Sequence, residues 1–144
     1  MLLTMKAALG AAAALVTSAL GMAPSVLAQP EMHFFKSPSG NIACLVDADW
    51  VRCDIEERDW SPPPRPADCP SQTGYGQGIH LDAYGKPEFV CAGDTTFSPD
   101  AKTLKYGERD SSTTILCTSE AAGIRCENRE GHGFVISRES YELF

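Results

Sequence analysis

Two stretches of this chain place a pair of cysteines at the same spacing. In each stretch an Ile-x-Cys tripeptide is followed by eight residues and a second cysteine, which gives the pairs Cys44/Cys53 and Cys117/Cys126. The second cysteine follows an apolar residue and an arginine in both copies, and an acidic residue comes after it. A β-hairpin over each stretch brings its two cysteines opposite each other on neighbouring strands. We therefore predict two similar hairpins, each closed by its own disulfide.

The first copy predicts a hairpin with a two-residue loop at Ala48 and Asp49. Alternation with a period of two then places six apolar side chains on one face of the hairpin, namely Ile42, Cys44, Val46, Val51, Cys53 and Ile55. Asp47, Arg52 and Asp54 fall on the other face, which we expect to be exposed to solvent. We also expect Arg52 to pair with these neighbouring carboxylates.

The second copy predicts a four-residue loop, residues 120–123, which keeps Cys117 opposite Cys126. Gly123 is available wherever this loop requires a positive φ. Arg125 occupies the position that corresponds to Arg52 in the first copy. We expect Arg125 to pair with the acidic residues of its own hairpin.

The chain contains an even number of cysteines: Cys44, Cys53, Cys69, Cys91, Cys117 and Cys126. An even number in an exported chain predicts disulfides rather than free thiols. If each hairpin is bridged internally, Cys69 and Cys91 remain to pair with each other. Six cysteines allow many other connectivities, so the residues alone leave those pairings open.

The rest of the chain also predicts strands and loops rather than long helices. Residues 60–70 contain five prolines and predict an extended connector. Residues 78–83 and 88–91 predict a third hairpin, and residues 131–136 predict a last strand. Ser137 is expected to cap a short helical turn. The predicted fold is a small, mainly β, disulfide-stapled single domain, and the sequence leaves open whether it is a barrel or a sandwich.

The first 28 residues have the pattern of a signal peptide. Lys6 precedes an apolar run over residues 7–20, which is too short to span a bilayer. Small or modest side chains at residues 26–28 predict cleavage after Ala28. Gln29 would then begin the mature chain, so the cysteine needed for lipid attachment at that position is missing. We expect one secreted or extracytoplasmic domain, residues 29–144, without membrane insertion after cleavage.

The composition gives the predicted mature domain an acidic surface. The whole chain has 12 basic and 19 acidic residues, and cleavage removes Lys6, which leaves 11 basic residues and a net charge of −8. Such a charge repels nucleic acids and anionic lipids. It favours a basic partner, although acidity also serves solubility alone.

Five motifs together resemble those of an uncharacterised family, a domain of unknown function in small secreted bacterial proteins that is frequent in mycobacteria and related actinobacteria. They are Ser37-Pro38-Ser39-Gly40-Asn41-Ile42-x-Cys44, Val51-Arg52-Cys53-Asp54-Ile55, Cys91-x-Gly93-Asp94-Thr95, Tyr106-Gly107 and Gly131-His132-Gly133-Phe134-x-x-Ser137-Arg138. The resemblance covers nearly the whole predicted mature chain. It implies secretion and a shared cysteine framework, and it supplies no activity, ligand or catalytic residue.

Few residues are candidates for chemistry. The histidines His33, His80 and His132 are scattered, and the chain has no Cys-x-x-Cys, His-Glu-x-x-His or Gly-x-Ser-x-Gly motif, so we predict no metal, no cofactor and no catalytic nucleophile. The remaining surface candidates are Asp94, His132 and Arg138. Asp94 also fits a turn after a strand, and the glycines around His132 also fit a tight turn.

We therefore predict a non-enzymatic binding or structural module that presents an acidic surface to a protein or cell-envelope partner. An inhibitor of a basic enzyme such as lysozyme fits this class. The alternative is a small extracellular hydrolase that uses carboxylates such as Asp94 or Glu88 with His80 or His132. The sequence names neither the partner nor the oligomeric state.

Overall fold

The computed structural model describes residues 10, 13–14, 18–24 and 32–144. The cleavage point predicted after Ala28 lies outside the described residues. Every regular element within them is a β-strand. None of these residues belongs to a helix that is long and apolar enough to cross a membrane. The prediction of a mainly β fold is confirmed.

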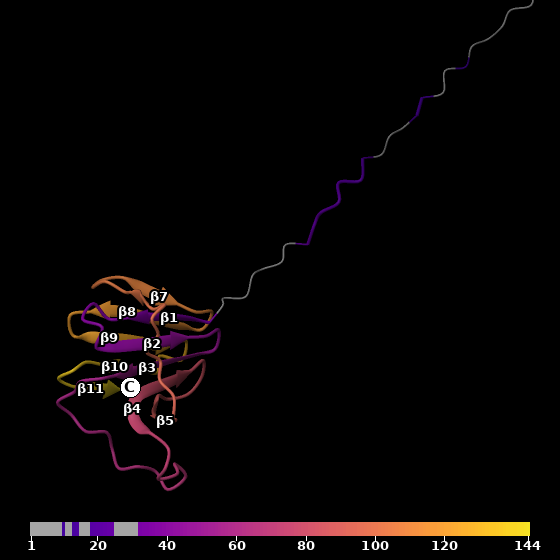
Figure 1. The fold of residues 1–144 in the computed structure, drawn as a ribbon. Helices are drawn as coiled ribbons and strands as arrows, with labels where there is room; N and C mark the ends of the chain where they lie inside the picture. The colour runs from indigo at the N-terminus through magenta and orange to yellow at the C-terminus, as the bar shows by residue number, and fades with distance from the viewer. Residues whose placement is uncertain (1–9, 11–12, 15–17, 25–31) are drawn as a thin grey trace, which may run out of the picture.

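The first sheet, sheet A, has six strands in the order β5-β4-β3-β2-β1-β6. All of them except β6 are labelled in Figure 1. These strands are β1 (His33–Lys36), β2 (Ile42–Val46), β3 (Trp50–Ile55), β4 (Tyr75–Asp82), β5 (Glu88–Cys91) and β6 (Lys102–Thr103). Neighbouring strands are antiparallel except β1 and β6, which run parallel. The predicted third hairpin is confirmed as β4 and β5, and β4 begins earlier than predicted, at Tyr75.

The second sheet, sheet B, has five antiparallel strands in the order β11-β10-β9-β8-β7. These strands are β7 (Arg109–Ser111), β8 (Ile115–Glu120), β9 (Gly123–Asn128), β10 (Gly133–Ile136) and β11 (Tyr141–Leu143). Each sheet is built from one continuous stretch of the chain, and the two sheets form separate layers (Figure 1). The fold is therefore a sandwich and not a single closed barrel.

The two predicted hairpins stand inside the two sheets. The register places Cys44 opposite Cys53 in β2–β3 and Cys117 opposite Cys126 in β8–β9, and each pair forms a disulfide. The first loop has two residues as predicted. The second is also a two-residue loop rather than a four-residue loop, because residues 120 and 123 already pair as part of the ladder.

The third predicted bridge, between Cys69 and Cys91, is also present. It fastens the proline-rich connector, residues 60–70, to the end of β5. Figure 1 shows the segment between β3 and β4 extending away from the sandwich before it returns to sheet A. The guanidinium of Arg65 donates hydrogen bonds to the carbonyl oxygens of Pro70 and Thr73, which fixes the far end of the connector.

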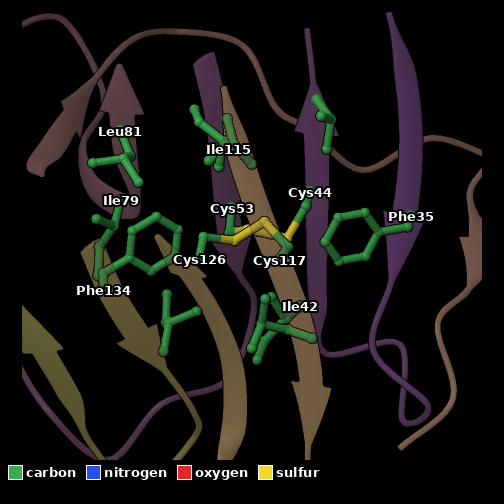
Figure 2. Close-up of a cluster of buried hydrophobic side chains, with 14 of the residues drawn as sticks. Phe35, Ile42, Cys44, Cys53, Ile79, Leu81, Ile115, Cys117, Cys126 and Phe134 are labelled. Carbon is green, nitrogen blue, oxygen red and sulfur yellow. A yellow bond between two sulfur atoms is a disulfide. The ribbon is translucent and has the colours of Figure 1, made fainter. Parts of the chain in front are cut away.

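The core lies between the sheets and contains both central disulfides (Figure 2). The four sulfur-bearing residues of these bridges are at most 1% exposed. The largest buried side chains around them include Phe35, Ile79, Leu81, Ile124, Phe134 and Ile136. Full burial of one such side chain contributes about 1.5–3 kcal/mol, so the inward face of each hairpin drives the packing of the two sheets.

The predicted helical turn after Ser137 is wrong. Residues 137–140 form the turn that joins β10 to β11, and β11 pairs with β10 at the edge of sheet B. The Ser137 hydroxyl donates to the carbonyl of Ser140 and accepts from the Ser140 N–H. The Ser137 hydroxyl therefore bonds nearby backbone groups in a hairpin turn. The same ability to bond nearby backbone groups lets a serine cap a helix.

Candidate functional site

A groove lies at one end of the sandwich, where loops from both sheets meet. Its walls come from the β1–β2 loop, the residues after β3, the loop before β7, the β8–β9 loop and the β10–β11 loop. The cavity has a volume of about 470 Å³. The polar side chains along it, which define the loop-end groove, are Ser37, Ser39, Asn41, Glu56, Glu57, Tyr106, Glu120, Ser137, Arg138 and Glu139.

The β1–β2 loop enters the groove as a closed turn. The Ser37 N–H donates to the carbonyl of Ile42, and the Gly40 N–H donates to the carbonyl of Ser37. Gly40 has a φ of +77°, which a residue with a side chain rarely adopts. The Ser37 hydroxyl also accepts the Ile42 N–H, so this wall of the groove is fixed by its own hydrogen bonds.

The β8–β9 loop reaches the groove because Gly123 lies very close to β10, the next strand of sheet B. Gly123 has a φ of +129°, and a Cβ at this position would stand 2.3 Å from the carbonyl oxygen of Ile136. Only glycine fits both the backbone conformation and the space. The absence of a side chain here lets Glu120 and Ala121 line the groove beside the β10–β11 loop.

The β10–β11 loop is tied to the segment that follows β3. The Asp59 N–H donates to the carbonyl of Arg138 at 2.8 Å, and the Trp60 indole N–H donates to the carbonyl of Ser137 at 2.8 Å. The Trp60 ring also packs against Tyr141 of β11, with ring centroids 4.7 Å apart. These contacts join sheet A to sheet B and hold the backbone under the groove.

The groove carries more negative than positive charge. Arg138 lies 3.0 Å from Glu57 and 3.9 Å from Asp59, so one arginine is shared by two carboxylates. The other three glutamates of the groove, Glu56, Glu120 and Glu139, are exposed and form no ion pair within the part of the chain that the structure describes. A concave surface with this charge attracts cationic groups.

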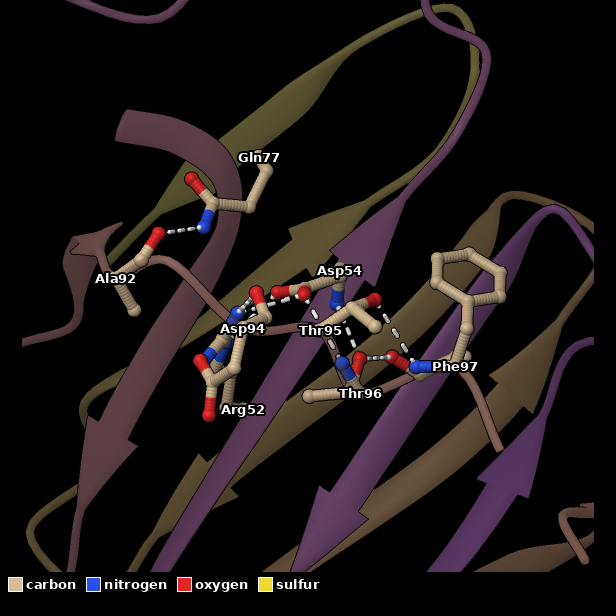
Figure 3. Close-up of polar contacts among 9 residues, drawn as sticks. Arg52, Asp54, Gln77, Ala92, Asp94, Thr95, Thr96 and Phe97 are labelled. Atoms are coloured by element: carbon tan, nitrogen blue, oxygen red, sulfur yellow. Dashed lines mark hydrogen bonds and ion pairs between the residues drawn. The ribbon is translucent and has the colours of Figure 1, made fainter. Parts of the chain in front are cut away.

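A second polar cluster lies on the outer face of sheet A (Figure 3). Arg52 Nε and Nη2 donate to the two carboxylate oxygens of Asp54 at 2.8 and 2.7 Å, and Nη1 donates to Asp94 at 2.6 Å. The Thr96 N–H donates to Asp54, and the Thr96 hydroxyl donates to the carbonyl of Ala43. These bonds strap the segment after β5 across the sheet.

This strap overturns the expectation that the polar face of the first hairpin is exposed to solvent. Arg52 is 8% exposed and Asp54 is 2% exposed, because the segment of residues 92–97 covers them. The expected pairing of Arg52 with Asp54 is confirmed, and Asp94 joins it from 42 residues away. Alternation along a strand shows which residues share a face, but it does not show whether a distant loop covers that face.

The ion pairs in this cluster shift two pKa values. Burial lowers the pKa of Arg52, but its hydrogen bonds to Asp54 and Asp94 outweigh this effect and leave that pKa raised. The hydrogen bond from Arg52 lowers the pKa of Asp94, and the attraction between their charges lowers it further. Arg52 therefore stays protonated and Asp94 stays ionised, which favours the strap rather than proton transfer.

The three surface candidates from the sequence lie in different places. Asp94 belongs to the strap, and Arg138 lines the loop-end groove. His132 lies in the β9–β10 loop, where its N–H donates to the Asn128 side chain and its carbonyl accepts the Asn128 N–H. The turn expected around His132 is present. The fold therefore does not gather these three residues into one site.

Sequence reasoning missed most of the groove. Glu56 and Glu57 follow the predicted strand directly, and two adjacent acids at a strand end were a signal that could have been noticed. Glu139 lies just after Ser137, where the sequence predicts a helical turn, and that turn does not form. The acidic partner of Arg125 is Glu127, at 3.0 Å, which leaves Glu120 to the groove.

Comparison with known proteins gives a family but no function. No curated protein and no solved structure matches the chain. The model of one family, described as a family of unknown function, matches residues 2–144. The resemblance to an uncharacterised family, inferred from the five motifs, is supported by this match. The chain belongs to this family of unknown function, DUF6636.

Proposed function

We propose that this protein is an exported binding module, rather than an enzyme, whose loop-end groove receives a basic side chain of a protein partner. The charge of the groove carries the proposal. Four glutamates and one arginine line it, and Glu56, Glu120 and Glu139 form no ion pair within the described residues. Carboxylates in a concave site raise the local concentration of cations and speed the approach of a basic partner.

Three further features support this function. The net charge of the chain is −7, so the field around the whole molecule has the same sign as the groove. The two core disulfides hold the hairpins whose ends form the groove, and the bonds of Ser37 and Ser137 fix its loops, which reduces the entropy lost on binding. Loops at one end of a rigid sandwich are also a common position for binding residues. An inhibitor of a basic enzyme such as lysozyme fits these properties.

Export is part of the proposal. The apolar run over residues 7–20 and the three disulfides support it, because disulfides persist in oxidising compartments. The intact mass of the protein recovered outside the cytoplasm tests this. A chain that begins at Gln29 and has no free thiols is the expected result, and a chain that retains residues 1–28 would contradict cleavage.

The groove is tested by neutralising its unpaired glutamates. We expect the triple variant Glu56→Gln/Glu120→Gln/Glu139→Gln to bind lysozyme, used as a basic probe, about tenfold more weakly than the unmodified protein, since three exposed charges that each contribute about 0.5 kcal/mol together approach the roughly 1.4 kcal/mol of a tenfold change. Isothermal titration calorimetry at low salt measures the affinity. The difference between the two proteins should shrink at high salt, because salt screens exposed charges.

A matched control variant separates the groove from the overall charge. Asp68, Asp100 and Glu142 are exposed and lie outside the groove, so Asp68→Asn/Asp100→Asn/Glu142→Gln removes the same charge elsewhere. We expect this control to weaken binding to lysozyme by less than the groove variant does. Equal weakening by the two variants would show that the groove is not the contact. If lysozyme and an arginine hexapeptide both fail to bind, the proposed function is wrong.

The hydrolase alternative requires carboxylate and imidazole groups in one cleft. His80 pairs with Asp82 on the outer face of sheet A at 2.9 Å, while His132 lies in the β9–β10 loop. The residues that line the loop-end groove include four glutamates and no histidine. The placement of these groups therefore supports binding better than acid–base catalysis by the residues that the alternative names.

A further inference from the structure

Within the described residues, the outer face of sheet A is covered on one half, and we call the other half the open half. The strand registers place one row of side chains next to each other on this face: Phe34, Leu45, Arg52, His80 and Glu88. The segment of residues 92–97 covers the half that contains Asp54, to which the Thr96 N–H donates. Near the start of β3, the Trp50 side chain remains partly exposed. Leu45 and His80, which belong to the row above, are partly exposed as well.

Trp50 offers an aromatic ring on this open half. Its indole stacks on the imidazole of His80, with ring centroids 5.5 Å apart. Other aromatic rings already have an arginine over them, in the pairs Arg58/Trp60, Arg65/Tyr75 and Arg125/Phe144. Within the described residues no lysine or arginine lies over Trp50. Its ring is therefore available to a cation from outside the molecule.

Carboxylates stand beside this ring. Asp82 lies directly opposite Trp50 in the strand register, and 68% of its side chain is exposed. Asp82 Oδ1 pairs with His80, while Oδ2 makes no hydrogen bond within the described part of the chain. Glu88 lies opposite His80, and Asp49 precedes Trp50; both are exposed. The rim of the open half is therefore acidic.

The nearest arginine adds no free positive charge to this rim. The guanidinium of Arg52 is bonded to Asp54 and to Asp94, as described above. Asp94 is 79% exposed, so its second oxygen faces solvent on the same side of the sheet. The open half thus combines a tryptophan ring, over which no lysine or arginine of the described residues lies, with unpaired carboxylate oxygens, and this combination is complementary to a planar cation.

The hairpin tip that carries Trp50 is held in place. The Asp47 N–H donates to the carbonyl of Trp50, and the Asp47 side chain accepts the Ala48 N–H. The Ala83 N–H, just after β4, donates to the carbonyl of Asp49 at 2.7 Å. A surface that is ordered before contact loses less entropy when a partner binds.

We propose that the Trp50 platform, formed by Leu45, Trp50, His80, Asp82 and Glu88, is a second contact surface for a basic protein partner. An arginine of the partner stacks on the Trp50 indole and pairs with Asp82. The choice of a basic partner rests on the proposed function, but the platform is separate from the groove. Trp50 begins β3 and Glu56 follows its end, which places them roughly 20 Å apart along the strand. Arginine fits better than lysine because its planar guanidinium stacks and bonds at the same time.

The two tryptophans of the chain make the test specific to each site. Trp50 lies on the platform, whereas the Trp60 indole N–H donates to the Ser137 carbonyl under the groove. A ¹⁵N-labelled sample gives one indole N–H signal for each tryptophan, and Trp50→Phe assigns them. The probe is an arginine hexapeptide, titrated at low salt and compared with a lysine hexapeptide of the same length.

We expect the Trp50 indole signal to move and saturate with the arginine peptide at a lower concentration than with the lysine peptide. Asp82→Asn should raise the concentration of arginine peptide at half saturation about threefold, which corresponds to the loss of one exposed ion pair. Asp68→Asn removes an exposed carboxylate of the connector and serves as the matched control. It should change this concentration by much less.

Other outcomes separate the two proposals. Movement of the Trp60 signal alone would overturn the platform and leave the groove supported. Movement of the Trp50 signal alone would support the platform and contradict the groove. If neither signal moves, both proposals are wrong. If Asp82→Asn and Asp68→Asn have equal effects, the overall charge of the protein explains the response of the Trp50 signal. That result would also overturn the platform.

Discussion

Asp54 is the residue on which the strap over sheet A depends. It is 2% exposed, and it accepts hydrogen bonds from two nitrogens of Arg52 and from the Thr96 N–H. Its own N–H donates to the Thr96 hydroxyl. A buried ion pair contributes little compared with a well-packed apolar pair, but removal of Asp54 would leave the buried guanidinium of Arg52 with the 79% exposed Asp94 as its one charged partner within the described residues.

We therefore expect Asp54→Ala to lower the free energy of unfolding by about 3–5 kcal/mol. Asp94→Ala should lower it much less, because the Asp94 side chain is 79% exposed. Urea unfolding of the disulfide-bonded protein, followed by circular dichroism, measures both. In the double variant Arg52→Leu/Asp54→Leu the loss should be smaller than in Asp54→Ala. A loss as large in the double variant would contradict this account of the buried charge.

The pH dependence of Asp94 follows from its contact with Arg52. The hydrogen bond from Arg52 lowers the pKa of Asp94 from its ordinary value of 3.8, so the ionised form favours the folded state. This stabilisation is present above pH 3.8 and is lost as the pH falls below that value through the lowered pKa. Titration of the carboxyl ¹³C signals should show Asp94 protonating at a lower pH than in the Arg52→Gln variant. The same pKa in both proteins would rule out the ion pair in solution.

At the scale of elements, the two bridged hairpins differ in how closely their loops approach other strands. The β2–β3 loop lies at the end of the sandwich away from the groove, whereas the β8–β9 loop lies against the end of β10. Gly123 makes this approach possible, because its missing Cβ leaves room for the carbonyl of Ile136. The shape of the groove therefore depends on one glycine in a hairpin.

We expect Gly123→Ala to destabilise the protein by more than about 1 kcal/mol, because it adds backbone strain at positive φ to a clash with Ile136. Gly93 is a matched control: its φ is not in the left-handed region, and a Cβ there would meet no atom within 4 Å. Gly93→Ala should change the stability by less than about 1 kcal/mol, in either direction. Thermal unfolding of both variants tests the difference. Equal melting temperatures would contradict the close contact.

At the scale of the whole molecule, the three disulfides have different access to solvent. The bridges Cys44–Cys53 and Cys117–Cys126 lie in the core between the sheets, where each cysteine is at most 1% exposed. The bridge Cys69–Cys91 lies at the end of the connector, and Cys91 is exposed. A thiolate reaches a disulfide only where a sulfur is accessible, so access decides the order of reduction in the folded protein.

Mild reduction of the folded protein should therefore open Cys69–Cys91 first. Trapping with an alkylating reagent and peptide mapping should find label on Cys69 and Cys91 before any of the four core cysteines. Complete reduction should unfold the domain, because each bridge contributes about 3 kcal/mol and a small domain has only about 5–15 kcal/mol of net stability. Simultaneous labelling of all six cysteines without a partly labelled species would contradict the predicted order.

The sequence alone determined the hairpins of this fold and the register of the cysteines within them. Equal cysteine spacing and two-residue alternation predicted the hairpins and placed Cys44 opposite Cys53 and Cys117 opposite Cys126, and the structure confirms these two bridges. Cys69–Cys91 followed only as the pair that remains if both hairpins are bridged. The hairpins and their registers depend on residues close together in the chain, where strand geometry leaves few choices. The family resemblance rested on the same short motifs.

Only the tertiary structure decided the sandwich, the strap and both candidate surfaces. Asp94 reaches Arg52 across 42 residues, and Trp60 reaches Ser137 across 77 residues. No periodicity within a strand encodes which distant loop will cover its outer face, as the burial of Arg52 and Asp54 shows. The glutamates of the groove come from three separate segments, and they share one cavity only because the packing of two apolar faces brings the ends of both sheets together.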